Sequence, residues 1–534
     1  MGKTKKQLLV LCFVCVFVLS GVLAGCSSNN NSKKSSANET ATTKNTGTTN
    51  ETENSNANTD KLIEINWLSF NPPETDNTPV QQALEKKFNV KFKNIRVERA
   101  DYRGQINLKV SSGDIPDVMY LDGGKDVSDL AEQGILAEMP IEEIQAKMPE
   151  YAPTVDQVDP NLWKYALVGD KNYAIPLYWE IGNMPFLPAY NGAWLKKIGY
   201  DHAPTTLEEF EDVIRKFRND DPDGNGKKDT FGYSGQGADG RSFTPIFSAF
   251  GVKNGWMMDE NGSIVHGLMT DGARGAFKLL NKWYKEGLID PEFITKNADD
   301  AHNDFINGIV GVRDWQSYQF NTDTGIIGPR FKAKNPDSEL VIGKMLKGTV
   351  ESVKAYSYGA PNGFIALGAQ VAKDEEKKER IFQILRALSS DEETYLLSAY
   401  GVEGDHYDMV DGVPIVKPEY SSEVTRNKIG AGTFYSFFYT KTKLMEKYDY
   451  TKSALEYIDR VTEGVDVYPT IPGFVSAQND YPDVGKVANA YFIKFVTGEL
   501  DGDANFQKFV DEWNKSGQAK ITEEFNEKYG DIYK

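Results

Sequence analysis

The sequence predicts an α/β protein with a parallel sheet, because strand and helix patterns alternate from about residue 61. Ile63, Ile65 and Trp67 alternate with polar residues, as in a half-buried strand. An apolar helical face follows over residues 80–88, and residues 90–92 begin a second strand. Strands that alternate with helices in this way form a parallel sheet with helices on both faces.

Polar residues follow two of these strands. Residues 116–121 are predicted to form a third strand, which ends at Asp122, and the first strand leads to Asn71. Ligands of open α/β sheets bind beyond the carboxyl ends of the strands. We therefore expect Asn71 and Asp122 to lie near a cleft.

Later segments add more helices and a strand. Thr206 and Glu209 have the spacing of a capping box, and an apolar helical face follows as far as Phe217. The same reasoning predicts two further helices and one strand, over residues 271–286, 375–388 and 363–367.

The first 25 residues form a predicted signal peptide. A lysine-rich start precedes an apolar run over residues 8–19, which is too short for a comfortable membrane span. Leu23-Ala24-Gly25-Cys26 resembles the bacterial lipobox, which implies that Cys26 is acylated. The alternative is a plain signal peptide followed by a chance cysteine. Cys12 and Cys15 are the other cysteines, so we expect no disulfide in the folded part.

Residues 26–60 are predicted to be a disordered tether behind the lipidated cysteine. The segment is rich in Asn, Ser, Thr, Lys and Glu and contains no aromatic residue. It therefore has too little apolar surface to form a core.

Charge and composition restrict the partners. The formal net charge is −18, which argues against nucleic acid and anionic lipid as partners. It also disfavours a highly anionic ligand, unless Lys and Arg gather at the site. The chain has 8 Trp, 27 Tyr and 28 Phe residues, enough to build stacking surfaces for a ligand.

A loop with an EF-hand pattern begins at Asp221. Its candidate ligands are the side chains of Asp221, Asp223, Asn225 and Asp229 and the backbone carbonyl of Lys227. Hard oxygen ligands in this number favour calcium over zinc or copper. Gly232 stands where an EF-hand has a bidentate glutamate, so water or a carbonyl would supply that ligand. The alternative is an Asx-rich turn without metal.

Motifs of enzymes are missing from the predicted folded part. It has no cysteine and no G-x-S-x-G, S-x-x-K or H-E-x-x-H motif. The histidines are scattered, at His202, His266, His302 and His406. Residues 235–240 match G-x-G-x-x-G but lack the surrounding β-α-β unit, so we interpret them as a loop beside a cleft. We predict that the protein is not an enzyme.

Four motifs together resemble one family. They are Gly113-Asp-Ile-Pro-Asp-Val118, Trp283-Tyr-Lys-Glu-Gly-Leu-Ile-Asp-Pro291, Asn303-Asp-Phe-Ile-Asn-Gly308 with Val312-Arg-Asp-Trp315, and Tyr400-Gly-Val-Glu-Gly-Asp-His-Tyr407. Their order and spacing resemble the extracellular solute-binding lipoproteins of ABC importers, in the large oligosaccharide-binding branch of the sugar-binding type 1 family.

The resemblance implies a two-lobed periplasmic-binding-protein-like (type II) fold, with a hinge and an interlobe cleft. Lobe one is expected at residues 61–180 with 345–400, and lobe two at 185–340 with 405–534. Hinge closure would bury an oligosaccharide, which an ABC permease then receives. The resemblance further implies a structural calcium ion and a monomer lipid-anchored on the outer face of the cytoplasmic membrane.

Sugars need aromatic platforms beside hydrogen-bonding side chains. Trp315 matches the lobe-two tryptophan of the family, and it follows Arg313 and Asp314. The other predicted ligand contacts are Tyr178, Trp179, Glu180, Trp67, Asn71, Asp122 and Trp256. For Trp67 the alternative is burial in the sheet, and for Trp256 it is capping of a lobe.

Two alternatives to the capture of an oligosaccharide remain. The same class of protein could bind a non-sugar ligand such as a peptide. A surface lipoprotein enzyme that acts on glycans is the other alternative.

Overall fold

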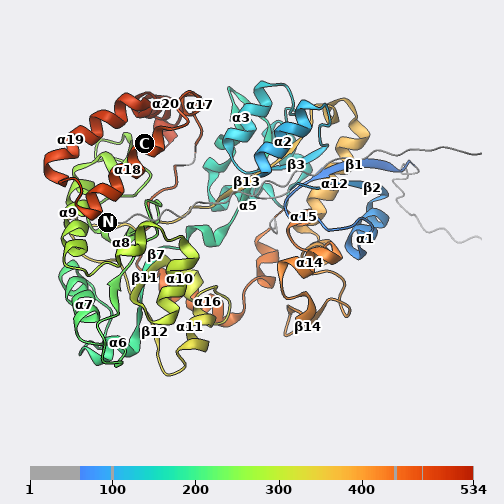
Figure 1. The fold of residues 1–534 in the computed structure, drawn as a ribbon. Coiled ribbons are helices and arrows are strands. Elements are labelled where there is room, and N and C mark those ends of the chain that lie inside the picture. Colours follow the sequence, from blue (N-terminus) through green and yellow to red (C-terminus); the bar gives the residue numbers. More distant parts are fainter. Residues whose placement is uncertain (1–60, 98–100, 438–441, 472, 533–534) are drawn as a thin grey trace, which may run out of the picture. The chain divides into compact units, whose positions relative to one another are not determined.

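Two β-sheets, each with its own hydrophobic core, organise the chain (Figure 1). The computed structural model describes residues 61–97, 101–437, 442–471 and 473–532. The predicted signal peptide, Cys26 and the tether lie outside these ranges. None of the described helices combines the length and the apolar character needed to cross a membrane.

The first sheet has five strands in the order β2-β1-β3-β13-β6. They are β1 (Ile63–Leu68), β2 (Val90–Ile95), β3 (Val118–Leu121), β6 (Ala174–Tyr178) and β13 (Pro361–Leu367). β1 is parallel to both β2 and β3, as predicted, whereas β13 is antiparallel to β3 and β6. The sheet is therefore mixed rather than wholly parallel.

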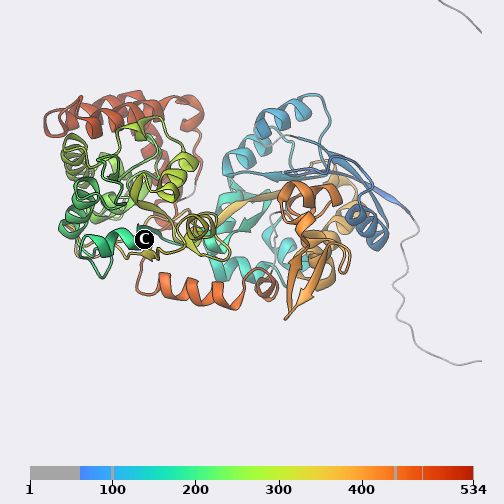
Figure 2. The same ribbon diagram turned by 60° about the horizontal axis from the view of Figure 1, so that its bottom comes forward.

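Helices cover both faces of this sheet (Figures 1 and 2). They are α1 (Pro79–Phe88), α2 (Tyr102–Ser111), α3 (Gly124–Glu132), α4 (Ile141–Lys147), α5 (Ala152–Val158), α12 (Glu375–Ser390) and α13 (Glu392–Tyr400). Local signals set their ends. Helix α1 begins at Thr78, whose side chain accepts a hydrogen bond from the Gln81 amide, and it ends at Asn89 in the left-handed conformation.

Trp67 is completely buried in the first core. Its Nε1 donates to the carbonyl of Phe434 at 3.0 Å, and its ring centroid lies 4.8 Å from that of Phe437. The indole has no exposed face for a ligand, which agrees with the alternative of burial in the sheet.

These contacts show that one boundary between the lobes differs from the expected boundary. Residues 429–437 were expected in lobe two, but their apolar side chains belong to the first core. The segment that brings them there contains β14 (Tyr407–Val410), β15 (Val413–Val416), α14 (Glu423–Ile429) and α15 (Thr433–Ser436). Burial of Phe434, Tyr435 and Phe437 against Trp67 and Phe92 explains this return to the first lobe.

The second sheet has the order β12-β7-β11-β8. Its strands are β7 (Phe186–Asn191), β8 (Phe231–Tyr233), β11 (Val310–Gln316) and β12 (Leu340–Ile342). β11 is antiparallel to β7 and parallel to β8. The chain thus leaves the first sheet after β6 and returns to it after β12.

Most remaining helices pack around the second sheet or follow it in sequence. They are α6 (Gly192–Lys197), α7 (Leu207–Asn219), α8 (Thr244–Ala249), α9 (Asp271–Lys285), α10 (Ala298–Asn307), α11 (Gly328–Lys334), α16 (Lys452–Thr462), α17 (Ala477–Asp480), α18 (Val484–Thr497), α19 (Gly502–Trp513) and α20 (Ala519–Tyr529). Two short hairpins complete the fold, β4–β5 (Leu167–Val168, Lys171–Asn172) and β9–β10 (Trp256–Met258, Ile264–His266).

The predicted helix after Thr206 is confirmed as α7. The Thr206 hydroxyl accepts a hydrogen bond from the Glu209 amide at 3.2 Å, while the Glu209 carboxylate accepts from the amide of Thr205 at 2.8 Å. The reciprocal bond of the expected capping box therefore goes to the preceding residue. The buried face of α7 runs from Leu207 to Phe217, as the apolar periodicity predicts.

Two charged residues in the middle of β11 are buried. Asp314 Oδ2 accepts hydrogen bonds from the amide and the hydroxyl of Thr244, both at 3.1 Å, at the start of α8. Arg313 Nη1 lies 3.8 Å from Asp314 Oδ1. Burial raises the pKa of Asp314 to about 6, although Arg313 opposes this change.

Asp314→Asn tests this burial. The folded chain holds the Asp314 proton more tightly than the unfolded chain, so the wild-type residue loses stabilisation as the pH rises from about 4 to about 6, by about 3 kcal/mol. Asparagine can still accept from Thr244 but does not ionise. The free energy of unfolding of the variant, relative to wild type, should therefore rise over this range in urea titrations. Asp337→Asn, at an exposed position, is the control; a pH-independent difference for Asp314→Asn would contradict the account.

Candidate ligand-binding site

The ends of β3 and β6 and the start of β13 lie at one edge of the first sheet. Because β13 runs antiparallel to both neighbours, Pro361 pairs with Tyr178 and Phe364 pairs with Leu121. Asp122 directly follows β3 and Trp179 directly follows β6. This edge therefore brings together two of the residues predicted to contact ligand.

An open pocket of about 320 Å³ lies beyond β3. This volume is within the range of small-molecule sites. Its lining includes Asp122, Lys125, Tyr165, Phe474, Gln478 and Tyr529. Gly363 also lines it, with φ of 93°, and a side chain there would overlap the hydroxyl of Tyr120. The pocket thus combines aromatic rings with a carboxylate and an ammonium group.

Arginine and aromatic side chains form a cluster near the same edge. The guanidinium carbon of Arg241 lies 4.9 Å from the Trp315 ring centroid, and Arg241 Nη1 donates to the Tyr358 hydroxyl at 3.2 Å. The ring centroids of Tyr358 and Trp179 are 6.1 Å apart. Asp239 Oδ1 accepts from Arg241 Nε at 2.7 Å and so holds the guanidinium in place. We call these five residues the arginine–aromatic cluster.

A second group of side chains packs against Trp315 inside lobe two. The Arg313 guanidinium carbon lies 4.7 Å from the Trp315 ring centroid, and Arg313 donates to His302 Nδ1 at 3.1 Å and to Gln236 Oε1 at 2.6 Å. Burial, together with Arg313, lowers the pKa of His302 to about 2, so this imidazole stays neutral and accepts. Arg313 and Asp314 are buried, and Trp315 is 7% exposed, so the structure places these three predicted contacts inside lobe two.

Other predicted contacts have structural partners. Asn71 donates to the Thr433 hydroxyl at 3.4 Å. The ring centroids of Trp256 and of Phe525 in α20 are 4.2 Å apart. This arrangement fits the lobe-capping alternative. Tyr178 stacks on Tyr151 at 5.9 Å, and Glu180 is half-buried in the turn after Trp179.

Sequence reasoning missed several residues of this region. Asp239 belongs to the glycine-rich loop 235–240 that was expected beside a cleft, and Arg241 directly follows it, so a signal for them existed. Tyr358 lies between β12 and β13, where no periodic pattern points to it. Phe474 comes from the far C-terminal segment, and its place in the pocket depends on tertiary structure alone.

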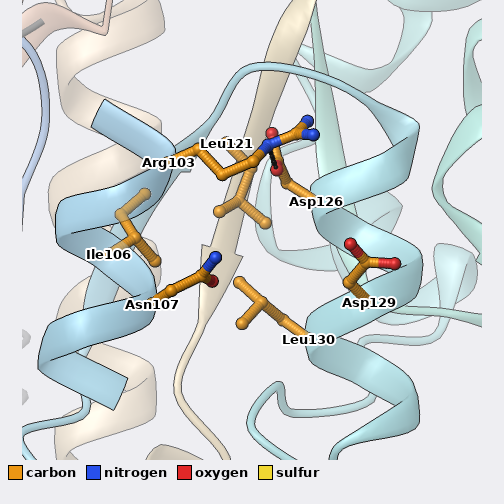
Figure 3. Close-up of a pocket in the computed structure, with 7 residues that line it drawn as sticks. All are labelled: Arg103, Ile106, Asn107, Leu121, Asp126, Asp129 and Leu130. Atoms are coloured by element: carbon orange, nitrogen blue, oxygen red, sulfur yellow. Dashed lines mark ion pairs between the residues drawn. The ribbon is translucent and has the colours of Figure 1, made fainter. Parts of the chain in front are cut away.

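A smaller pocket between α2 and α3 does not fit a solute (Figure 3). Arg103 Nε and Asp126 Oδ1 form an ion pair of 2.6 Å above it, and Ile106, Leu121 and Leu130 line it. Its volume of about 10 Å³ is enough for one water molecule at most.

The predicted calcium loop gathers carboxylates around one amide. Asn225 Nδ2 donates to Asp223 Oδ2 at 2.6 Å and to Asp229 Oδ1 at 3.1 Å, and the Gly226 amide donates to Asp221 Oδ2 at 3.1 Å. Asp221 Oδ1 is buried and has no hydrogen-bond partner. Burial and the neighbouring carboxylates raise the pKa of Asp223. Within the described ranges, no group of three or more His, Cys, Asp or Glu side chains is arranged to hold a metal ion.

Comparisons with known proteins agree with this architecture. Residues 80–312 match the family described as bacterial extracellular solute-binding protein. Lipoprotein LipO of Bacillus subtilis (strain 168) is 25% identical over 496 residues, which cover 90% of this chain and 94% of LipO. The polygalacturonan/rhamnogalacturonan-binding protein YtcQ of the same organism is 22% identical over 530 residues, or 97% of this chain and 98% of YtcQ.

A solved structure extends the likeness to the fold. The EF-hand mutant of the S. pneumoniae ABC-transporter substrate binding protein FusA, in complex with fructo-nystose, has a TM-score of 0.64 and 19% identity. The alignment covers 88% of this chain and 99% of that one. The expected two-lobed, periplasmic-binding-protein-like fold is thereby confirmed. Residues 80–312 thus match the bacterial extracellular solute-binding protein family, and 88% of the chain aligns with the fold of a solved substrate-binding protein.

Proposed function

We propose that this protein captures an oligosaccharide outside the cell and delivers it to the permease of an ABC importer. The arginine–aromatic cluster beside the strand-end pocket is the observation that carries the proposal. Stacking rings and fixed hydrogen-bonding groups are what a sugar requires. The names of YtcQ and of the FusA complex, which refer to carbohydrate ligands, support the same class.

Each group at the site has a role in this proposal. Trp179 and Tyr358 offer ring faces to the C–H faces of sugars, and Trp315 supports the cluster from lobe two. Asp122 and Arg241 offer hydrogen-bonding groups to sugar hydroxyls. Hinge closure would bury the ligand, because it adds contacts that the open form lacks.

The proposed lobes follow the two cores. Lobe one comprises residues 61–180 with 361–437, and lobe two is built on residues 185–346 with the helices α18 and α19. The protein binds its ligand as a monomer without chemical turnover. Lipidation at Cys26 holds it on the outer face of the cytoplasmic membrane, and the name of LipO as a lipoprotein supports this location.

We also infer a structural calcium ion in the loop 221–229. Asp221, Asp223, Asp229, the Asn225 side-chain oxygen and the Lys227 carbonyl would hold it, once the Asn225 amide turns its oxygen inward. The unpartnered Asp221 oxygen and the crowded carboxylates fit a hard cation. The solved FusA complex is that of an EF-hand mutant, which supports a site of this type in a related protein.

The sugar proposal is tested by a thermal-shift screen with oligosaccharides, followed by calorimetry on any hit. A ligand at a hundred times its Kd should stabilise the protein by about 2.7 kcal/mol, without product formation. Trp179→Ala should weaken binding about tenfold, since it removes one stacking face. Tyr420→Ala, on a half-buried aromatic residue outside the site, is the control. Stabilisation by peptides alone, or release of a cleaved glycan, would rule the proposal out.

The calcium proposal is tested by thermal unfolding of EDTA-treated protein with and without calcium. Calcium should raise the Tm of the wild type but not that of the double variant Asp223→Asn/Asp229→Asn. Asp259→Asn is a matched control, because the Asp259 carboxylate accepts from the amides of Asn261 and Ser263 in an Asx-type turn without the EF-hand spacing. An equal Tm shift in the double variant, or none in the wild type, would contradict the site.

A further inference from the structure

A second open pocket adjoins the pocket beyond β3. It has a volume of about 470 Å³, and its lining includes Ser128, Glu132, Phe474, Glu524, Glu527 and Lys528. Phe474 lines both pockets. Each pocket has the size of a small-molecule site, and they share a wall at this residue.

The helix α3 forms a continuous wall along both pockets. Lys125 lines the first pocket, and Ser128 and Glu132 line the second. These residues are three, four and seven positions apart, so they lie on one face of the helix. Seven residues of α-helix span about 10 Å, so the two pockets extend along the helix rather than around it.

The helix α20 forms an opposite wall in the same way. Tyr529 lines the first pocket, and Glu524, Glu527 and Lys528 line the second. The Lys125 ammonium lies 4.5 Å from the Phe474 ring centroid, and the Tyr165 and Tyr529 rings are 6.3 Å apart. Helices α3 and α20 therefore border both pockets, and Phe474 lies where the two pockets meet.

The second pocket is acidic. Glu132, Glu524 and Glu527 outnumber its single cation, Lys528, whose Nζ donates to the carbonyl of Phe474 at 3.2 Å. Ser128 donates to Glu132 at 3.1 Å, and Ser476 and the Ala477 amide donate to Glu524 at 3.0 and 2.9 Å. Carboxylates accept hydrogen bonds from sugar hydroxyls or amines, whereas they repel the carboxylate of a uronic acid.

From this geometry we infer that the ligand is an extended oligosaccharide that occupies both pockets, with an uncharged or amino sugar unit in the second. This inference rests on the proposed carbohydrate function and adds chain length and charge to it. A disaccharide would fill the first pocket and leave the second to water. An acidic unit in the second pocket would meet like charge.

The test is calorimetric titration of the full chain with size-graded sugars of two to six units. The neutral probes are cello-, xylo-, manno-, malto- and fructo-oligosaccharides, and the acidic probes are oligogalacturonates. One neutral series should bind with affinity that rises at least tenfold from two units to the longest members. Phe474→Leu, which keeps an apolar side chain without the ring, should reduce this gain. The disaccharide affinity should change less. Tyr481→Ala, on an aromatic residue of the same segment that lines neither pocket, is the control.

A charge variant completes the test. Glu132→Gln/Glu527→Gln should strengthen binding of oligogalacturonates at least several-fold relative to binding of the neutral series, because it removes two like charges from the second pocket. Affinity that does not rise beyond the disaccharide would overturn the inference while the carbohydrate function stands. Oligogalacturonates that bind more tightly than every neutral series would overturn the charge assignment. Failure of all these sugars to bind would overturn the proposed function itself.

Discussion

The antiparallel return of β13 into the first sheet is the constraint on which the candidate site depends. β13 lies between β3 and β6, so its start meets the ends of both strands. Asp122, Trp179 and Tyr358 are far apart in sequence, yet this one strand places all three near the same edge. The β12–β13 connection also links the two sheets, so Tyr358 belongs to a segment that joins the lobes.

Buried charge gives the site its rigidity. Arg313 would be costly inside the second sheet without partners, and the loss of one partner from a buried ion pair typically costs about 3–5 kcal/mol. Asp314 is the oppositely charged neighbour of Arg313, and His302 and Gln236 accept hydrogen bonds from its guanidinium group. Both Arg313 and Arg241 thereby contact the Trp315 ring. A ring fixed in this way loses little further freedom when a ligand docks, which favours binding.

Local patterns predicted much of the fold. The strands β1, β2 and β3 and the helices α7, α9 and α12 lie where periodicity and capping residues place them. Contacts between distant segments were harder to foresee. Trp67 alternates with core residues, but only the distant Phe434 and Phe437 show that its ring is buried. Arg241 and Phe474 were not predicted as site residues for a similar reason, because sequence periodicity does not indicate which distant segments come into contact. Asp122 was predictable because it directly follows a predicted strand, and Trp179 because an aromatic ring stands there beside hydrogen-bonding side chains.

Hydrogen exchange with and without a bound oligosaccharide tests the central claim most directly, namely that two lobes hold one ligand at this edge. The account predicts joint protection of residues 122–125 in lobe one and of residues 236–241 in lobe two, together with the connecting residues 179–183 and 356–360. Protection confined to a single lobe, or located away from these segments, would contradict it.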